Sequence, residues 1–499
     1  MLAIVVSRAD SASVHISEHL RVLADWREHT DGSRPEGEGG GTVYRLGGAP
    51  DADDPSDADD PPDADDPPDA DDPTVGPAVE LREFDDLHLD LTDAADAFGR
   101  VDGDGEEGED GGDDAADRAH PDLLVFASRH AGETDELLTA HHTGNFGPAD
   151  YGGEPGKFAR ACPNAHRRVL DALREHAPPD YEVGTECTHH GPTAVGAPSM
   201  FVEVGSAETQ WEDPAAARAV AEAILDLRDV PADAPAENGS RRQVVGFGGG
   251  HYAPRFERIA RETDWAVGHV AADWGLEAMG DPAENRAVLE RVFAESAATL
   301  AVVEGDRPGL VATIEDLGYR VVGETWVRET AGVPLGLVER VEADLGGIDD
   351  GVRFGDPASA ADSAAAFTVV NLPADLLAEA RGIDGDRAWN AVADIALAFT
   401  TEHDGALVGA RAALADSTDR RAVVESLAAI LEASYDSVTV TDEAVVAERS
   451  AFDPEKARAL GVSEGPAFGK LSAGEAVDVG GRTIPPEVVH EERTERFPY

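Results

Sequence analysis

The sequence has 499 residues, in which 101 acidic side chains face only 40 Lys and Arg side chains, so the formal net charge is −61 at pH 7. This charge excludes a nucleic-acid-binding surface spread over the whole molecule and a protein that coats anionic membranes. Apolar residues make up 41% of the chain and occur in groups, which excludes a fully disordered protein, and the length allows two domains with cores of their own.

The preference for Arg over Lys indicates the salt concentration in which the protein works. Only Lys157, Lys456 and Lys470 are lysines, and every other cation is Arg. In a cytosol at molar salt, carboxylates hold water and ions, and charge repulsion is screened within about 3 Å at 1 M. We therefore expect the protein of an extreme halophile.

The chain begins with an apolar run, residues 1–6, that has neither a basic lead-in nor a cleavage site. The run predicts a buried strand rather than a signal peptide. No stretch approaches the ~20 apolar residues of a membrane helix. Cys162 and Cys187 are too few for a disulfide framework. We expect a cytoplasmic monomer without a membrane partner.

Two acidic segments interrupt the first part of the chain. Residues 51–74 are four copies of a proline-containing hexamer with a net charge of −12, and residues 102–118 carry −8. Proline in every copy, with no apolar side chain larger than Ala, excludes helix and strand from the first segment. We predict that both segments are disordered inserts, and a charge of −41 remains on the rest.

Predicted strands and helices alternate outside these inserts. The apolar runs 123–127, 199–205 and 242–247 are typical of strands covered on both faces. Helical periodicity covers residues 155–176, 213–228, 254–262, 283–297 and 333–345. This alternation predicts an α/β domain with three α/β/α layers over residues 1–350, followed by an α+β extension over residues 355–499.

Nine of the sixteen histidines lie between residues 130 and 269. His is the side chain suited to proton transfer near neutral pH and to metal binding, so this clustering predicts the functional site. The candidate residues lie near predicted strand ends, where open α/β sheets place their sites. They are His130, His142, Glu186, His189, His190, Glu203 and His251.

The glycine-rich segment 246–250 precedes a predicted helix. Its backbone N–H groups and the positive end of that helix favour an anion such as a phosphate or a carboxylate. A dinucleotide fingerprint is excluded because His251 stands where the last Gly would be. The alternative is a tight strand-to-helix turn in which His251 caps a backbone carbonyl.

The segment Glu186-Cys187-Thr188-His189-His190 carries carboxylate, thiolate and imidazole groups, which are zinc ligands. The spacing is no standard zinc signature, and adjacent histidines on an extended segment point in opposite directions. A metal site would therefore need one of them and a partner such as His130, His142 or His251. The alternative is a pair of histidines bonded to backbone in a polar loop.

Several of these strings occur together in one order. They are Phe126–His130, Leu138–Asn145, Thr185–Thr193, Phe201–Ser206 and Gly246–Phe256. In this respect the sequence resembles the archaeal and plant type of D-aminoacyl-tRNA deacylase, over about residues 1–345. The resemblance implies a phosphorylase/peptidyl-tRNA-hydrolase-like α/β/α fold, hydrolysis of the ester at the tRNA 3′ end, and a zinc requirement.

We therefore predict a hydrolase that releases free D-amino acid and tRNA from D-aminoacyl-tRNA, a form of chiral proofreading, with no DNA partner. His130, His142, Glu186 and His251 are the predicted catalytic residues, although the 2′-hydroxyl of the terminal ribose could be the base instead. Predicted metal ligands are His189, His190 and Cys187, with zinc as the metal. The predicted substrate-binding residues are Gly248, Gly249, Gly250, Tyr252, Thr188 and Glu203.

Two other functions fit the same residues. A zinc-dependent amidohydrolase or peptidase would use the His and Glu cluster on a small substrate. A tRNA-binding protein without catalysis would contact the RNA through Arg-rich stretches such as Arg241-Arg242. Residues 453–488 faintly resemble a segment of the tRNA 3′-processing endonucleases, and an RNA contact there would involve Lys456 and Lys470.

Overall fold

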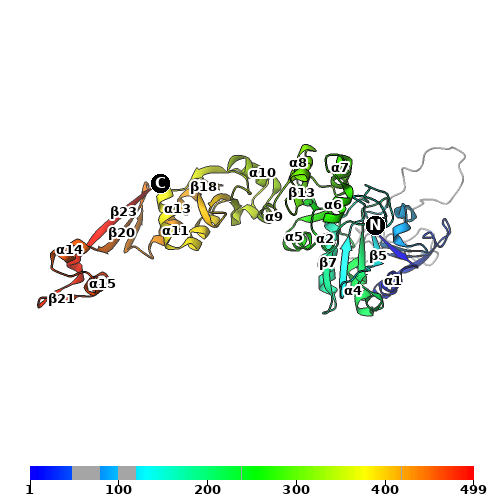
Figure 1. Ribbon diagram of the computed structural model, residues 1–499, viewed down its shortest axis with the longest axis horizontal. Helices are drawn as coiled ribbons and strands as arrows, with labels where there is room; N and C mark the ends of the chain where they lie inside the picture. Colours follow the sequence, from blue (N-terminus) through cyan, green and yellow to red (C-terminus); the bar gives the residue numbers. More distant parts are fainter. Residues whose placement is uncertain (48–78, 99–119, 238, 417) are drawn as a thin grey trace, which may run out of the picture. The chain divides into compact units, whose positions relative to one another are not determined.

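The structure is a computed structural model, and it describes residues 1–47, 79–98, 120–237, 239–416 and 418–499 (Figure 1). The two predicted acidic inserts, 51–74 and 102–118, lie outside the described residues. The chain divides into two compact units, Met1–Arg328 and Glu329–Tyr499. Strands and helices of both units confirm a mixed α/β protein. None of the helices described is long and apolar enough to span a membrane.

The first unit contains an eight-stranded mixed sheet in the order β2-β3-β4-β1-β5-β8-β6-β7. Its central strands β4, β1, β5 and β8 are parallel, and β6 runs antiparallel to β8. The predicted strands at 1–6, 123–127 and 199–205 are confirmed as β1, β5 and β8. The strands are β1 Leu2–Ser7, β2 Arg27–Asp31, β3 Gly41–Leu46, β4 Val79–Phe84, β5 Leu123–Arg129, β6 Leu137–His141, β7 Glu182–Thr185 and β8 Ser199–Gly205.

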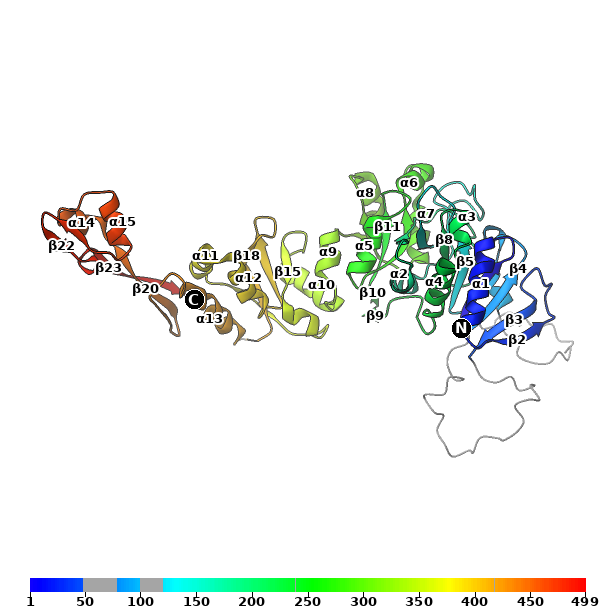
Figure 2. The same ribbon diagram turned by 90° about the horizontal axis from the view of Figure 1, so that it is seen from below.

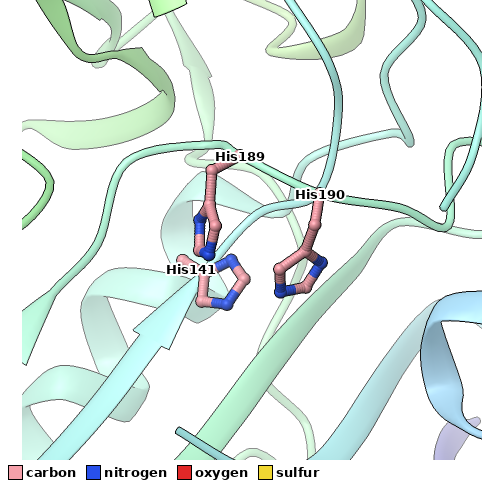
Figure 3. A group of neighbouring side chains, drawn as sticks. All are labelled: His141, His189 and His190. Carbon is pink, nitrogen blue, oxygen red and sulfur yellow. The ribbon is translucent and has the colours of Figure 1, made fainter. Parts of the chain in front are cut away.

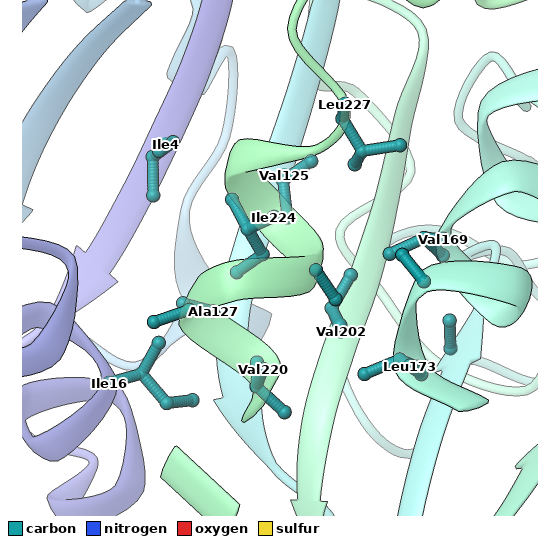
Figure 4. Close-up of a cluster of buried hydrophobic side chains, with 14 of the residues drawn as sticks. Ile4, Ile16, Val125, Ala127, Val169, Leu173, Val202, Val220, Ile224 and Leu227 are labelled. Atoms are coloured by element: carbon teal, nitrogen blue, oxygen red, sulfur yellow. The ribbon is translucent and has the colours of Figure 1, made fainter. Parts of the chain in front are cut away.

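Three helices cover one face of this sheet, and the main core lies between these helices and the sheet. They are α1 Ser11–Leu23, α2 Pro163–His176 and α4 Pro214–Leu225. In Figure 2, α1 and α4 lie side by side along the sheet. Their apolar stripes contact the inward side chains of the strands, as Figure 4 shows for Ile16, Val169 and Val220 against Val125 and Val202. Helix α2 begins later than the predicted residue 155 because Pro163 occupies its first turn.

The opposite face of the sheet differs from the predicted helical layer. It packs against the 3-10 helices η1 His88–Asp90 and η2 Ala94–Ala97 and against loop residues such as Val195 and Ala197. The segment 191–198 contains two prolines and two glycines, which disfavour an α-helix. Loops and short turns therefore form this layer, and they leave room for a cavity above the sheet.

A second, four-stranded parallel sheet completes the first unit, in the order β12-β11-β13-β14. The predicted strand at 242–247 is its strand β11. Helices α5, α7 and α8 accompany it, and the first two confirm the periodicity at 254–262 and 283–297. The elements are β11 Gln243–Phe247, α5 Pro254–Glu262, β12 Ala266–Ala271, α6 Asp273–Met279, α7 Arg286–Glu295, β13 Leu300–Val303, α8 Pro308–Asp316 and β14 Arg320–Val321. Three short elements lie between β8 and β11 along the chain: α3 Glu208–Trp211, β9 Ala236–Glu237 and β10 Ser240–Arg241.

The second unit begins at Glu329, earlier than the predicted boundary at residues 350–355. Helix α10 Leu335–Asp344 belongs to it because Arg340 on this helix donates hydrogen bonds to the carbonyls of Ser363 and Ala365. An antiparallel sheet in the order β15-β17-β18-β16 forms its centre, as the predicted α+β class requires. The elements are β15 Val352–Phe354, β16 Thr368–Asn371, α11 Ala374–Ile383, α12 Gly385–Ala393, β17 Ala398–Glu402, β18 Leu407–Leu414 and α13 Asp419–Leu431.

A small module is inserted into the last sheet of this unit. Strand β20 Ala444–Phe452 pairs with β19 Ser437–Val440 and with β23 His490–Pro498, and Phe452 lies opposite His490. The residues between them have a core of their own that includes Leu471 and Ile484. The module comprises α14 Pro454–Ala459, α15 Pro466–Ser472, β21 Val477–Val479, β22 Arg482–Ile484 and η5 Pro486–Val489.

Candidate active site

A cavity of about 490 Å³ lies above the central strands of the first unit. Strand β5 leads directly to His130, and strand β8 carries Glu203. The cavity lining contains five of the predicted site residues, which are His130, His189, His190, Glu203 and His251. Segments that are far apart in the sequence therefore meet at this cavity, as the clustering of histidines predicts.

Three histidines form a group beside the cavity: His141 at the end of β6, and His189 and His190 on the loop after β7 (Figure 3). One nitrogen from each ring lies within 4.8 Å of one from each of the others. The chain bends at Thr188, and the adjacent rings of His189 and His190 lie with centroids 4.4 Å apart. The expectation that adjacent histidines point in opposite directions holds for extended backbone, and this loop is not a strand.

Backbone carbonyls fix the protonation of these three rings. Nδ1 of His141 donates to the carbonyl of His142, that of His189 to Cys187, and that of His190 to Gly191, over 3.1, 2.8 and 2.6 Å. Because a carbonyl only accepts, each Nδ1 carries the hydrogen and each Nε2 keeps its lone pair. Burial lowers the pKa of each imidazole to about 3, so all three are neutral at pH 7.

This donor set fits a zinc ion. Nε2 of His141 is buried and has no hydrogen-bond partner. Neutral imidazoles whose other nitrogen is bonded to a carbonyl are the usual zinc ligands, and three of them leave a coordination position for substrate or water. Two members of the group, His189 and His190, are predicted metal ligands. The third member is His141, whereas the sequence predicts Cys187.

The Cys187 thiol belongs to a neighbouring grouping with His189 and His251. Burial, reinforced by the charge of Glu186, raises the pKa of the thiol to about 12. Its Sγ lies 3.7 Å from Nδ1 of His251, to which the thiol donates. Because a metal ligand must be a thiolate, the protonated Cys187 does not fit its predicted role as a metal ligand. It fits a role in positioning the His251 ring better.

Glu186 lies beneath the cavity and joins two of its histidines. Its Oε2 accepts a hydrogen bond of 2.7 Å from Nε2 of His251, and its Oε1 lies 3.2 Å from Nδ1 of His130. Burial opposes ionisation of this carboxyl, but the contacts with His130 and His251 outweigh it and hold its pKa well below the usual value. Glu186 is therefore an ionised carboxylate that orients both rings.

Tyr252 completes this network from the loop after β11. With Nδ1 of His130 directed at the carboxylate of Glu186, its Nε2 accepts a hydrogen bond of 2.9 Å from the Tyr252 hydroxyl. Burial raises the pKa of Tyr252, so the hydroxyl keeps its hydrogen at neutral pH. A proton pathway therefore runs from the Tyr252 hydroxyl through His130 to the vicinity of Glu186.

Glu203 differs from Glu186 in its charge. Burial, together with the charges of Glu186 and Asp10, raises the pKa of Glu203 well above its usual value. Its Oε2 lies 3.8 Å from Nδ1 of His130 and 3.8 Å from Nε2 of His141. The site thus contains one ionised and one protonated carboxyl group, an arrangement that separates acid from base.

His142 and Thr188 lie in a different group, away from the cavity lining. Nδ1 of His142 donates to the carbonyl of Gly268 over 3.1 Å, and its ring lies beside those of His166 and His269. The Thr188 hydroxyl lies 3.1 Å from Nδ1 of His269. The predicted catalytic role of His142 and binding role of Thr188 do not agree with this placement, because both side chains are enclosed by protein.

The glycine-rich loop does not form the predicted anion pocket. The N–H of Gly248 donates to the carbonyl of Ala271, and that of Gly249 donates to the carboxylate of Asp273 over 2.7 Å. Both glycines have positive φ, at 100° and 87°, so the segment is a tight turn after β11. Gly250 is exposed beside this turn. The sequence could not reveal that protein groups already use these donors.

Four titratable side chains of the cavity lining lie outside the predicted set: Asp10, His88, Arg129 and Tyr151. His141 is a fifth addition to the site. Strand pairing explains it: Thr139 lies opposite Glu203 and His141 lies opposite Phe201, so these residues share the face of the sheet that carries the cavity. The sequence alone does not show that β6 pairs with β8.

Comparison with known proteins supports a family assignment. The family model of D-aminoacyl-tRNA deacylase matches residues 117–322, which lie within the first unit. A D-aminoacyl-tRNA deacylase of Haloarcula marismortui is 52% identical over 501 residues and covers 100% of both chains. One of Halorubrum lacusprofundi is 53% identical, covering 100% of this chain and 97% of its own, and one of Natronomonas pharaonis is 51% identical with 100% coverage of both.

Among solved structures, a conserved protein of unknown function is similar with a TM-score of 0.49 and 25% identity, covering 66% of this chain and 98% of that chain. The sequence relatives match the whole length, and the site residues predicted from the sequence, from His130 to His251, lie within the part that the family model matches. The chain belongs to the D-aminoacyl-tRNA deacylase family.

Proposed function

We propose that this protein hydrolyses the ester bond of D-aminoacyl-tRNA and releases a free D-amino acid and tRNA. Membership of the family supports the reaction and the substrate. The single structural observation that carries the proposal is the cavity of about 490 Å³ that places His130 and Glu203 together with three neutral histidines. Chiral selection would come from a cavity shape that accepts the D side chain and excludes the L form.

The first proposed step is the attack of water on the ester carbonyl. The water gives its proton to the Tyr252 oxygen as the Tyr252 hydroxyl passes its own proton to Nε2 of His130, which lies 2.9 Å away. The ionised Glu186, 3.2 Å from Nδ1 of His130, stabilises the imidazolium that forms. His130 and Tyr252 thus act together as the general base.

The second proposed step is departure of the ribose oxygen. Glu203 is protonated and lines the cavity, so it donates a proton to this oxygen as the carbonyl–oxygen bond breaks. The site is restored when the Nε2 proton of the His130 imidazolium returns through the Tyr252 hydroxyl to solvent water and Glu203 takes up a proton from solvent, which leaves the hydrogen of His130 on Nδ1. Water and ester are consumed, and the carboxylic acid and the tRNA hydroxyl are formed.

We also propose that His141, His189 and His190 hold a zinc ion. Their neutral rings and the unpartnered Nε2 of His141 support this assignment. Zinc in this position would polarise the ester carbonyl as a Lewis acid. The phosphorylase/peptidyl-tRNA-hydrolase-like fold, the cytoplasmic location and the halophilic source complete the proposal, and the acidic, Lys-poor composition supports the last.

The test is an incubation at molar KCl with D-tyrosyl-tRNA and L-tyrosyl-tRNA, in which free tyrosine is measured. We expect release from the D ester alone, strongly reduced in His130→Gln and normal in His176→Gln, whose ring binds Asp226 on the helical face. No release from the D ester would overturn the proposal, and equal release from both would overturn the chiral selection. Cleavage of small amides without tRNA would instead favour an amidohydrolase.

A further inference from the structure

The rim of the cavity carries an aromatic side chain that the proposed chemistry does not use. Tyr151 lines the cavity, yet 69% of its surface is exposed. It is one of five large apolar side chains with such exposure in the described chain, and the other four, including Trp274, lie outside this cavity. An exposed ring at the entrance of a polar cavity is available to contact a ligand that enters it.

The loop that carries Tyr151 is held firmly by backbone contacts. The carbonyl of Tyr151 accepts a hydrogen bond of 3.0 Å from the N–H of Gly191, next to His190, and the carbonyl of Gly152 accepts one of 3.0 Å from the Asn145 side chain. A Cβ atom on Gly191 would lie 2.5 Å from the Gly152 carbonyl carbon, so glycine is required for this close approach. The ring is therefore presented from a fixed position beside the histidines.

The wall next to Tyr151 is apolar. Leu87 and Leu89 line the cavity with it, and a Cβ atom on Gly152 would lie 2.5 Å from the carbonyl oxygen of Leu89, so the two loops touch. Arg129 lines the same cavity from the end of β5. The cavity thus has a polar part with histidines and carboxyls and an apolar rim with an aromatic ring.

We propose that Tyr151, with Leu87 and Leu89, forms a subsite on which the adenine of the 3′-terminal nucleotide of tRNA stacks. The inference rests on the proposed function, because the ester to be cleaved is attached to the ribose of that nucleotide and its base must lie near the entrance. Aromatic rings that face solvent bind unpaired bases by stacking, which requires no charge. A protein with a net charge of −61 gains little from phosphate contacts, so stacking suits it.

The first test compares the kinetics of variants on D-tyrosyl-tRNA. Loss of one stacked base lowers affinity by about tenfold to hundredfold, so we expect Tyr151→Ala to raise KM by this factor with kcat nearly unchanged. Tyr151→Phe keeps the ring and should stay within about twofold of the wild type. Trp274→Ala, which removes an exposed ring outside the cavity, is the matched control. An unchanged KM in Tyr151→Ala overturns the subsite.

A second test does not depend on hydrolysis. Equilibrium dialysis measures binding of the trinucleotide CpCpA and the dinucleotide CpC to the wild-type protein and to the same variants. We expect Tyr151→Ala to weaken binding of CpCpA alone. Equal binding of CpCpA by wild type and Tyr151→Ala, or no measurable binding by the wild type, overturns the subsite. If the wild type binds CpCpA through Tyr151 but cleaves no D-aminoacyl ester, the subsite stands and the proposed function fails.

Discussion

His130 is the residue on which the proposed chemistry depends most. It contacts the ionised Glu186 through Nδ1 and the Tyr252 hydroxyl through Nε2, and it lies 3.8 Å from the protonated Glu203. These three neighbours determine where its hydrogens lie before and after water attacks. Changes in its neighbours should therefore alter the rate more than they alter substrate binding.

Replacement of Tyr252 tests the proton relay. In Tyr252→Phe, Nε2 of His130 loses its donor and the relay of the water proton is broken, so we expect kcat to fall by about tenfold to hundredfold or more while KM stays nearly constant. Tyr181→Phe removes a hydroxyl that binds Asp213 at a distance from the cavity and is the matched control. Steady-state kinetics on D-tyrosyl-tRNA measure both, and a Tyr252→Phe enzyme with wild-type kcat would exclude Tyr252 from the relay.

Buried neutral histidines make the stability of the protein dependent on pH. Burial lowers the pKa of His166 to about 4, of His269 to about 3 and of His88 to about 4, whereas an unfolded chain binds protons near pH 6.5. Their contribution is fully present above pH 6.5 and is lost as the pH falls, because the unfolded state then binds protons that the folded state excludes. Each group lowers the free energy of unfolding by up to about 1.4 kcal/mol per pH unit.

Denaturant titrations at pH 7.5, 6.0 and 5.0 in constant KCl measure this dependence. We expect the free energy of unfolding to decrease steadily toward pH 5.0. His166→Gln removes one titrating group, and its amide can still donate to the carbonyl of Ala140 that binds Nε2 of His166. Its dependence on pH should be weaker than that of the wild type, and an identical slope for both proteins would contradict the assignment of a neutral His166.

At the scale of secondary structure, two glycines hold the ring of His130, one at the end of β8 and one in the loop after β5. A Cβ atom on Gly205, the last residue of β8, would lie 2.7 Å from Cβ and Cδ2 of His130. A Cβ atom on Gly132 would lie 2.6 Å from Nε2 of the same ring. The end of β8 and the loop after β5 therefore approach His130 more closely than any residue other than glycine at these two positions allows.

Gly205→Ala should displace the His130 ring. We expect a loss of activity of at least about tenfold and a decrease of about 1–3 kcal/mol in the free energy of unfolding, as for other overpacked sites. Gly184→Ala in strand β7 of the same sheet is the control, because its Cβ atom would meet only Leu137 Cδ1 at 3.8 Å. Activity and stability of the control should remain near the wild-type values, and an equally active Gly205→Ala would show that the ring can shift without cost.

Elements with strong local patterns were predictable from the sequence. The apolar runs at 123–127 and 199–205 are β5 and β8, and the helical periodicity at 213–228 is α4, where the Asp213 side chain caps the helix. The layer of turns above the sheet was not predictable, because no periodicity identifies 3-10 helices and loops. The start of the second unit depends on contacts of Arg340 across 23 and 25 residues, which the sequence does not display.

Prediction of the site residues was limited in the same way, because contacts between distant parts of the chain are not visible in the sequence. The clustering of histidines indicated the cavity and the five predicted residues of its lining, because the residue type alone carries that chemistry. The choice between His141 and His142 required the pairing of β6 with β8. The N–H groups of Gly248 and Gly249 donate to Ala271 and Asp273, which lie 23 and 24 residues later, so the sequence did not show that these donors are already used. Long-range pairing thus decides which members of the predicted group lie at the cavity.

At the scale of the whole molecule, the charge of −61 determines how an RNA substrate is recognised. At molar salt the Debye length is about 3 Å, so neither repulsion by the acidic surface nor attraction by single arginines extends beyond contact. Binding of tRNA must then rest on hydrogen bonds, stacking and the fit of the aminoacyl group in the cavity. The acidic composition is compatible with an RNA substrate for this reason.

This argument predicts a weak dependence of tRNA affinity on salt. Proteins that hold nucleic acid through many phosphates lose affinity steeply as salt rises, with a slope of about −0.7 to −0.9 per phosphate contact in a plot of log K against log salt. Between 1 and 3 M KCl we expect KM for D-tyrosyl-tRNA to change by less than about threefold, which corresponds to about one phosphate contact or less. The increase in KM caused by Tyr151→Ala should persist over the same range, because stacking does not depend on counterion release. A KM that rises by tenfold or more over this range would instead assign recognition to two or more phosphate contacts by cations such as Arg129 at the cavity, and Arg129→Gln should then reduce the slope by about one contact.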